Sequence, residues 1–91
     1  MLDAVFKALA DPTRRKILSL LREKPLNAGE IAAHFEISKP SISHHLNQLK
    51  DAGLIYGERD GTTITYHLNL TVFEELISSI ADLWKRGNHV R

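Results

Sequence analysis

The sequence of 91 residues contains no cysteine and no long run of apolar residues. Without cysteine the chain can form no disulfide framework, and a reducing compartment suits it. No segment approaches the roughly 20 apolar residues of a membrane-spanning helix. The first segment carries an acidic residue, Asp3, and lacks the sustained apolar run of a signal peptide. We therefore expect a soluble, cytoplasmic protein.

The sequence also lacks an excess of charge of either sign and any motif of a known catalytic class. With 12 Lys and Arg against 11 Asp and Glu, the formal net charge is only +1, which is weak for a nucleic-acid-binding protein. There is no glycine-rich phosphate loop and no nucleophile elbow. Ser43 is adjacent to His44, but neighbours in a helix point about 100° apart and cannot act as nucleophile and base. We therefore expect no enzymatic activity.

The length and the distribution of charge say more than the net charge does. The chain is expected to form one domain over residues 1–91, with no internal repeat. A domain of this size buries only roughly 60 to 65% of the surface of its unfolded chain, so a partner subunit would add stability. Residues 37–50 include two lysines, two histidines and no acid, whereas Glu74, Glu75 and Asp82 lie toward the C-terminal end. This distribution predicts a dipolar surface.

Residues 27–53 are the most informative segment, because they predict two short amphipathic helices joined by a tight turn. Asn27 is an N-cap residue, and Glu30 completes a capping box three residues later. Apolar residues then recur at the i, i+3, i+4 and i+7 spacing of one buried face. They are Ala28, Ile31, Ala32 and Phe35. The turn over residues 36–38 separates this helix from the next.

The second helix of this segment has an N-cap residue at Ser38, a first-turn proline at Pro40 and a C-terminal glycine at Gly53. Its predicted buried stripe consists of Ile42, His45, Leu46 and Leu49. Its outer face bears short or planar hydrogen-bonding side chains and no carboxylate before Asp51. They are Lys39, Ser41, Ser43, His44, Asn47 and Gln48. Because such side chains pair with base edges in the major groove, this helix is predicted to read DNA.

A β-hairpin is predicted directly after the reading helix, over residues 54–68. Asp60-Gly61 is the strongest short signal for a two-residue hairpin turn. The second strand alternates, and its inner face carries Ile64, Tyr66 and Leu68. A helix-turn-helix followed by a hairpin is a winged helix. The tip of the wing is expected to lie over the DNA backbone or the minor groove, and its contact residues are Arg59, Thr62 and Thr63.

The first helix, residues 1–10, is separated by Asp11 and Pro12 from a second helix. The second helix is expected to pack through Ile17, Leu20 and Leu21. A basic cluster in the same segment consists of Arg14, Arg15 and Lys16. Cations at the start of a helix oppose its dipole, so these side chains need another partner. A phosphate contact and an internal pair with a carboxylate are both open.

The last helix, residues 71–86, is predicted to begin with a capping box of Thr71 and Glu74. Its apolar stripe is wider than one small domain needs. The simpler alternative is that it only closes the core of the monomer. A symmetric dimer is favoured, with two reading helices about one helical turn, ~34 Å, apart on an inverted-repeat operator. The predicted interface residues are Leu2, Val5, Phe6, Leu9, Phe73, Leu76, Ile77, Ile80 and Trp84.

Two segments resemble motifs of the ArsR family of bacterial winged-helix repressors, and the resemblance extends over essentially the whole chain. They are LADPTRRKIL at residues 9–18 and SKPSISHHLNQLKDAGLI at residues 38–55. The resemblance implies a mainly α fold of five helices and a two-stranded wing, a homodimer formed through the first and last helices, and repression by operator occupancy. It implies DNA contacts at Lys39, Pro40, Ser43 and His44. The likeness to the small SdpR-type autorepressors further implies release by a membrane-bound anti-repressor.

Two alternatives to this interpretation are open. Metal-sensing members of the family use a Cys-x-Cys motif in the third helix or Asp and His ligands on the last helix. Here residues 30–38 hold no thiol, and Asp82 is spaced for ion pairs with Lys85 and Arg86. No metal or cofactor is therefore expected, although a metal-responsive repressor is one alternative. The other is a winged-helix module that binds protein or RNA, but the outer face lacks the exposed aromatics typical of RNA binding.

Overall fold

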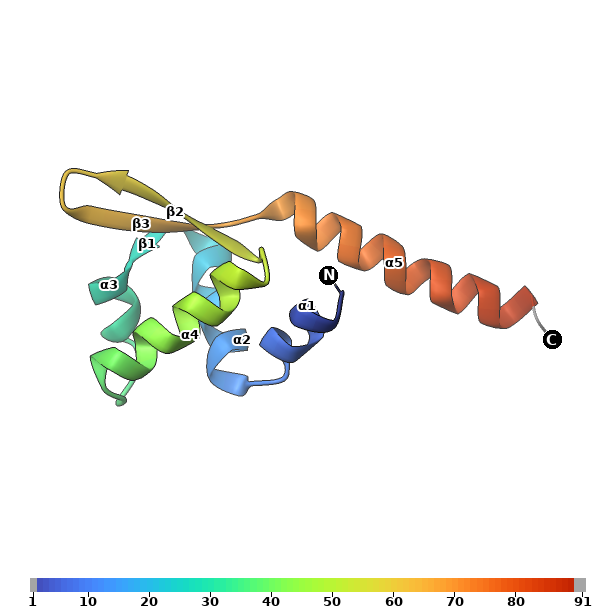
Figure 1. Cartoon of the computed structure of the whole chain (residues 1–91), viewed down its shortest axis with the longest axis horizontal. Helices are drawn as coiled ribbons and strands as arrows, with labels where there is room; N and C mark the ends of the chain where they lie inside the picture. Colours follow the sequence, from blue (N-terminus) through green and yellow to red (C-terminus); the bar gives the residue numbers. More distant parts are fainter. Residues whose placement is uncertain (1, 90–91) are drawn as a thin grey trace.

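The computed structural model describes the backbone of residues 2–89 and the side chains of residues 2–86. Four helices pack together beside a small sheet, and the last helix extends away from them (Figure 1). In chain order the elements are α1 (Leu2–Leu9), α2 (Pro12–Glu23), β1 (Leu26–Asn27), α3 (Ala28–Ala32), α4 (Lys39–Asp51), β2 (Ile55–Asp60), β3 (Thr63–Leu68) and α5 (Leu70–His89). This order of helices and hairpin confirms the predicted winged helix.

The sheet has one strand more than the predicted two-stranded wing. Its order is β1-β3-β2, and both pairs of strands are antiparallel. Leu26 of β1 pairs with Tyr66, and Ile55 of β2 pairs with Leu68. A strand of two residues has no alternation that a sequence pattern could reveal. The added strand joins the hairpin to the segment between α2 and α3.

The hairpin turn lies one residue later than predicted. Asp60 pairs with Thr63, so the turn consists of Gly61 and Thr62 rather than Asp60 and Gly61. Gly61 has a φ of +65°, and no residue other than glycine has a positive φ in the described chain. A two-residue hairpin turn with a positive φ at its first position alone is of the Gly-X kind. Asp60 therefore ends β2 instead of forming the turn.

The predicted start of α3 is confirmed, but its end is not. Oδ1 of Asn27 accepts a hydrogen bond from the Glu30 backbone N–H at 2.8 Å, and Oε1 of Glu30 accepts one from the Asn27 N–H at 2.9 Å. The helix ends at Ala32, so the stripe expected to run to Phe35 leaves it early. The Phe35 side chain nevertheless packs against the core from the turn that follows.

Both predicted ends of α4 are confirmed. Ser38 Oγ accepts a hydrogen bond from the backbone N–H of Ser41 at 3.3 Å. At the other end Gly53 has a φ of +80°, and its N–H donates to the carbonyl of Lys50 at 2.9 Å. The N–H of Leu54 donates to the carbonyl of Leu49 at 3.0 Å. These two bonds form a Schellman motif, in which glycine adopts the left-handed conformation without strain.

The predicted capping box of α5 is wrong. The helix begins at Leu70, which places Thr71 inside its first turn. The carbonyl of Asn69 accepts hydrogen bonds from the N–H groups of Val72 at 3.1 Å and Phe73 at 3.4 Å. The sequence pattern Thr-x-x-Glu is therefore present, but Thr71 is not at the N-cap position that a capping box requires.

The hydrophobic core lies between helices α1 to α4 and the sheet. Its largest fully buried side chains are Val5, Ile17, Ile31, Ile42, Leu46, Leu49, Leu54 and Ile55. Of the residues predicted to pack α2, Ile17 and Leu21 are buried and Leu20 is partly buried, while Leu18 joins the core unpredicted. Val5 and Leu76 are only 1% and 7% exposed within the single chain. They belong to the core of the protomer, so they offer almost no surface to a partner, which corrects their assignment to the interface.

Candidate nucleic-acid interface

The outer face of α4 is exposed because its opposite face is anchored in the core. Ile42, Leu46 and Leu49 are at most 2% exposed, and this stripe fixes the rotation of the helix. The predicted reading residues that are exposed are Lys39, Pro40, Ser41, Ser43, His44 and Asn47. Gln48 is half-buried, so less of its side chain is accessible than the sequence pattern implied.

The exposed face of α4 is uncharged or basic along its first three turns. The first carboxylate of the helix is Asp51, its last residue. At the N-terminus, Ser38 Oγ donates a hydrogen bond to Ser41 Oγ at 3.0 Å, in addition to capping the backbone. The positive end of the helix dipole also lies there. A surface of this kind attracts phosphate and offers both donors and acceptors to base edges.

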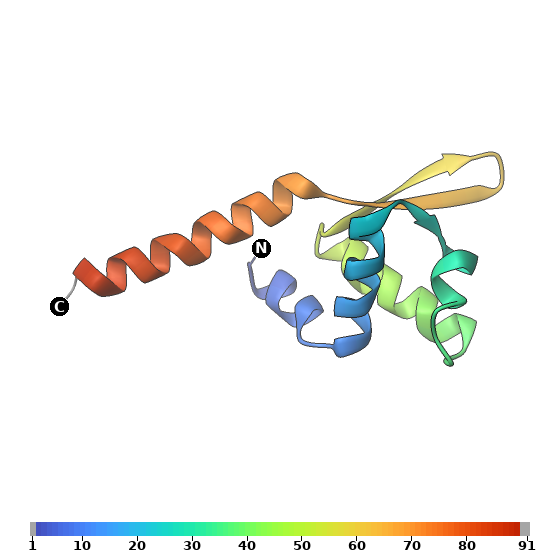
Figure 2. The same ribbon diagram turned by 180° about the vertical axis from the view of Figure 1, so that it is seen from behind.

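The tip of the wing supplies a second exposed set of polar residues. Arg59, Thr62 and Thr63 are all exposed, as predicted for groups that contact a DNA backbone. The tip and the first turn of α4 both lie at the end of the molecule away from α5 (Figures 1 and 2). An extended polyanion lying along this end would therefore meet both elements.

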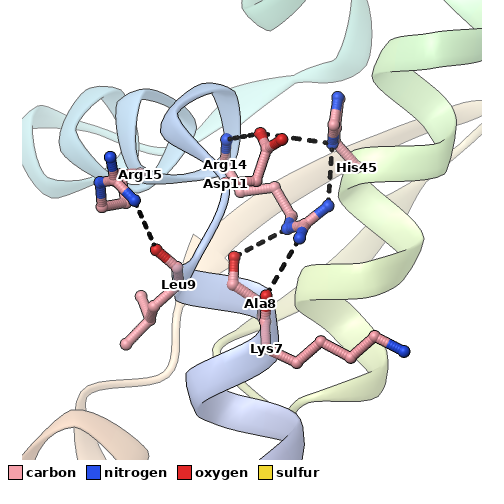
Figure 3. Close-up of polar contacts among 7 residues, drawn as sticks. All are labelled: Lys7, Ala8, Leu9, Asp11, Arg14, Arg15 and His45. Atoms are coloured by element: carbon pink, nitrogen blue, oxygen red, sulfur yellow. Dashed lines mark hydrogen bonds and ion pairs between the residues drawn. The ribbon is translucent and has the colours of Figure 1, made fainter.

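The basic cluster of α2 has partners that neither sequence hypothesis named. The Arg14 guanidinium donates from Nε to the carbonyl of Ala8 at 2.7 Å and from Nη2 to the carbonyl of Lys7 at 3.1 Å (Figure 3). Arg15 Nη1 donates to the carbonyl of Leu9 at 2.8 Å. These carbonyls are among the last four of α1, which have no partner inside the helix. Arg14 and Arg15 therefore cap α1, and among the described side chains neither forms an ion pair with a carboxylate, which was one of the two open alternatives.

Lys16, the third residue of the cluster, lies beside the turn after α3. Its ammonium group donates to the carbonyl of His34 at 3.4 Å and lies 4.9 Å from the centre of the Phe35 ring. The contact with the ring is a cation–π interaction. Lys16 thus holds the turn between α3 and α4 against α2.

Asp11 connects the start of α2 to the reading helix. Its Oδ2 atom accepts a hydrogen bond from the Arg14 backbone N–H at 3.1 Å, and it lies 3.9 Å from Nδ1 of His45. The hydrogen bond from the Arg14 backbone, together with the positive charge of the Arg14 guanidinium, lowers the pKa of Asp11 below its usual value, although partial burial opposes this shift. The residue is therefore an ionised N-cap at neutral pH.

α5 presents an apolar seam that the single chain leaves largely uncovered. The seam consists of Leu70, Phe73, Ile77, Ile80 and Trp84, which are spaced alternately by three and four residues. Leu70, Ile77, Ile80 and Trp84 are 64%, 66%, 48% and 71% exposed. Spacing of this kind is typical of a helix that packs along another helix. Phe6 of α1 is also 45% exposed, whereas Leu2 and Leu9 are partly buried.

Three other features of the described residues bear on the predictions from the sequence. Asp82 forms no ion pair with Lys85 or Arg86 among the described side chains, so that expectation is wrong. In the same part of the chain, no three His, Asp or Glu side chains are grouped as ligands of a metal ion. No helix within residues 2–89 is long and apolar enough to cross a membrane.

The arrangement of reading helix and wing matches a known family of regulators. The family model "Bacterial regulatory protein, arsR family" matches residues 11–56, which extend from the N-cap of α2 into β2. The chain belongs to this family. It is 51% identical over 88 residues to the transcriptional repressor SdpR of Bacillus subtilis (strain 168), a match that covers 97% of this chain and 98% of the relative. It is also 34% identical over 79 residues to the arsenical resistance operon repressor of Staphylococcus aureus, covering 87% and 76% of the two chains.

Solved structures described as an ArsR-like regulator and a possible ArsR-family regulator have the same fold. An ArsR-like transcriptional regulator from Rhodococcus sp. RHA1 superposes with a TM-score of 0.77 at 30% identity, covering 98% of this chain and 87% of the other. The homodimeric winged helix-turn-helix DNA-binding domain of Mb0332 from Mycobacterium bovis superposes with a TM-score of 0.72 at 30% identity, covering 89% and 78%. The arsR-family chain described here is thus a winged-helix transcriptional regulator, and the relatives named above are regulators rather than enzymes.

Proposed function

We propose that this arsR-family protein is a dimeric repressor that binds an inverted-repeat operator and blocks transcription by occupying it. The observation that carries the proposal is the exposed face of α4, which has no acidic residue before Asp51 and is held in place by a fully buried opposite face. Such a face fits the major groove of duplex DNA in shape and in hydrogen-bonding capacity. Its target is chromosomal DNA, so the protein is expected to act in the cytoplasm.

The exposed residues divide into two roles. Ser43, His44 and Asn47 lie on the outermost part of α4 and are proposed to contact base edges. Ser41, Pro40 and the half-buried Gln48 flank them. The groups proposed to contact the phosphate backbone are Lys39 at the start of α4 and Arg59, Thr62 and Thr63 at the wing tip. Base contacts give sequence preference, whereas phosphate contacts give affinity for any duplex.

The proposed dimer interface combines Phe6 of α1 with the apolar seam of α5. Leu2 and Leu9 contribute the part of their side chains that the core leaves exposed. A related domain from Mycobacterium bovis is described as homodimeric, which supports a two-fold arrangement for this chain. Two copies of α4 would then meet two half-sites about one helical turn apart.

Repression is supported by the names of the relatives. The Bacillus subtilis relative is a transcriptional repressor, and the Staphylococcus aureus relative represses an arsenical resistance operon. The membrane-bound anti-repressor implied by the sequence resemblance rests on that resemblance alone, and no residue of the structure is assigned to it.

The proposal is tested by fluorescence anisotropy with the DNA upstream of the gene and a random duplex, over a series of salt concentrations. The protein should bind the upstream duplex at least ~10³-fold more tightly than the random one, with a steep dependence on salt. Parallel titrations with a chelator test the metal-responsive alternative, which requires that the chelator change operator affinity. Equal, weak binding to both duplexes would contradict the proposal and favour a protein-interaction module.

Variants separate the two roles. Ser43→Ala and His44→Ala are expected to reduce the preference for the operator by ~1–3 kcal/mol each, because each removes a base contact. Lys39→Ala and Arg59→Ala are expected to weaken binding to both duplexes and to lower the salt dependence, because each removes a phosphate contact. Ser78→Ala on α5 is the matched control for Ser43→Ala. Equal losses on both duplexes for Ser43→Ala would contradict its proposed role.

A further inference from the structure

Arg14 joins three elements of the fold through one guanidinium group. Two of its nitrogens donate to the carbonyls of Lys7 and Ala8 at the end of α1, at 3.1 and 2.7 Å. Nη1 is 3.2 Å from Nδ1 of His45, which lies in the middle of α4 (Figure 3). Arg14 itself belongs to α2. No other described side chain is hydrogen-bonded both to α1 and to the reading helix.

We propose that Arg14 is a positioning residue that couples the dimerisation helix α1 to the reading helix α4 through His45. This inference rests on the proposed function, because α1 carries Phe6 of the proposed interface and α4 the proposed base contacts. The coupling sets the position of each α4 relative to the two-fold axis of the dimer. Arg14 therefore determines the half-site spacing that the dimer accepts, without touching DNA.

His45 is suited to this role by its place on α4. It adjoins His44, which is exposed and proposed to contact DNA, while its own side chain is only 16% exposed. The apolar residues of the stripe, such as Ile42 and Leu46, contact their neighbours without directional preference, so they tolerate small shifts of the helix. A hydrogen bond weakens steeply when its angle changes. The bond between Arg14 and His45 thus adds a directional restraint to the rotation that the buried stripe of α4 already sets.

The hydrogen bond from Arg14 determines which ring nitrogen of His45 is free of a proton. Arginine is always charged and has donors only, so Nδ1 of His45 must be the acceptor and must carry no proton. Asparagine at position 45 would retain a short acceptor close to the position of Nδ1, whereas leucine would retain the bulk and lose the acceptor. Lysine at position 14 would retain the charge but cannot reach three acceptors as a planar fork. These differences provide a set of matched variants.

Arg15 is the structural control. It also caps α1, through the carbonyl of Leu9, but it makes no hydrogen bond to α4. Arg15→Gln therefore removes one positive charge from α2 and one hydrogen bond to the end of α1. It leaves the hydrogen bond between Arg14 and His45 of α4 intact. If Arg14→Gln lowers the preference for the operator more than Arg15→Gln does, the difference is attributed to the hydrogen bond between Arg14 and His45.

The test measures binding of the full chain to an operator duplex, to a random duplex, and to operators whose two half-sites are moved apart or together by one base pair. Arg14→Gln, Arg14→Lys and His45→Leu are expected to lower the ratio of operator to random affinity about tenfold. These variants are also expected to lose less affinity than the unmodified protein when the half-site spacing is changed by one base pair. His45→Asn and Arg15→Gln should keep the ratio of the unmodified protein to within about twofold. Loss of stability alone would lower both affinities together and leave the spacing penalty unchanged.

The outcomes are distinguishable. If Arg14→Lys keeps the full ratio, or Arg15→Gln loses as much as Arg14→Gln, Arg14 acts through charge or capping and the inference is overturned. If Arg14→Gln does not fold, His45→Leu and His45→Asn still test the inference. An equal ratio of operator to random affinity in these two variants would show that the acceptor at position 45 is not needed, and the inference would be overturned. If the unmodified protein shows no preference for the operator, the proposed function fails and not this inference alone.

Discussion

Replacing Ile77 by aspartate should separate the proposed dimer without unfolding its protomers. Ile77 lies in the middle of the apolar seam of α5 and is 66% exposed in the single chain. Its substitution therefore removes little from the core of the protomer. In a two-fold dimer the same change occurs twice, and each copy would bury a carboxylate without a partner.

The expected effect follows from the exposed fraction. Complete burial of an isoleucine side chain is worth about 1.5–3 kcal/mol, so covering the exposed two-thirds is worth about 1–2 kcal/mol per protomer. Two copies contribute about 2–4 kcal/mol, which corresponds to an increase of about 30-fold to 900-fold in the dissociation constant of the dimer. The desolvation of the two carboxylates adds to this increase.

Sedimentation velocity over a range of protein concentrations measures the dissociation constant directly. Ser78→Asp is the matched control, because Ser78 is exposed and lies about 100° around the helix from Ile77. The control should remain dimeric at concentrations where Ile77→Asp is monomeric, and circular dichroism should show both variants folded. A dimer of unchanged strength in Ile77→Asp would refute the assignment of the interface to this seam.

Three further changes test other parts of the molecule. Ser38→Ala removes the N-cap of α4 and should lower the free energy of unfolding in urea by about 1 kcal/mol; an unchanged value would show that the cap contributes nothing. Gly57→Ala places a Cβ 2.8 Å from Cγ2 of Ile64 and should lower the free energy of unfolding by about 1–3 kcal/mol, seen as a lower midpoint of thermal unfolding. A variant with the midpoint of the unmodified protein would contradict this close contact. Asp11→Asn keeps an acceptor for the Arg14 N–H but cannot ionise. Because the fold lowers the pKa of Asp11, the ionised carboxylate stabilises the protein above the unfolded pKa of about 3.9, and this stabilisation is lost as the pH falls through the folded value. The advantage in stability of the unmodified protein over Asp11→Asn should therefore shrink on acidification below about pH 4, whereas a constant difference would argue against the lowered pKa.

The sequence predicted those features of the fold that depend on neighbouring residues. The caps formed by Asn27, Ser38 and Gly53 each involve partners no more than five positions away, so the residue types sufficed to locate them. The same holds for the outer face of α4, which follows from helical periodicity once the helix is located.

The features that depend on distant partners were missed. β1 exists only because Leu26 pairs with Tyr66, and no local pattern distinguishes two such residues from a loop. The partner of Arg14 on α4 is 31 positions away, so its position at a helix start suggested phosphate or a carboxylate instead. Val5 and Leu76 show the converse error, because periodicity identifies an apolar face but cannot tell whether the same chain or a second copy covers it.

In the proposed dimer, the extended α5 would make operator binding depend steeply on the amount of protein. Much of its apolar seam has no covering within one chain, so in the proposed dimer the pairing of subunits supplies that covering. Below the concentration at which subunits pair, the amount of dimer rises with the square of the amount of free chain. Occupancy of an inverted-repeat operator would follow that square. A cell that halves its supply of the protein in this range would therefore lose about three-quarters of the binding species.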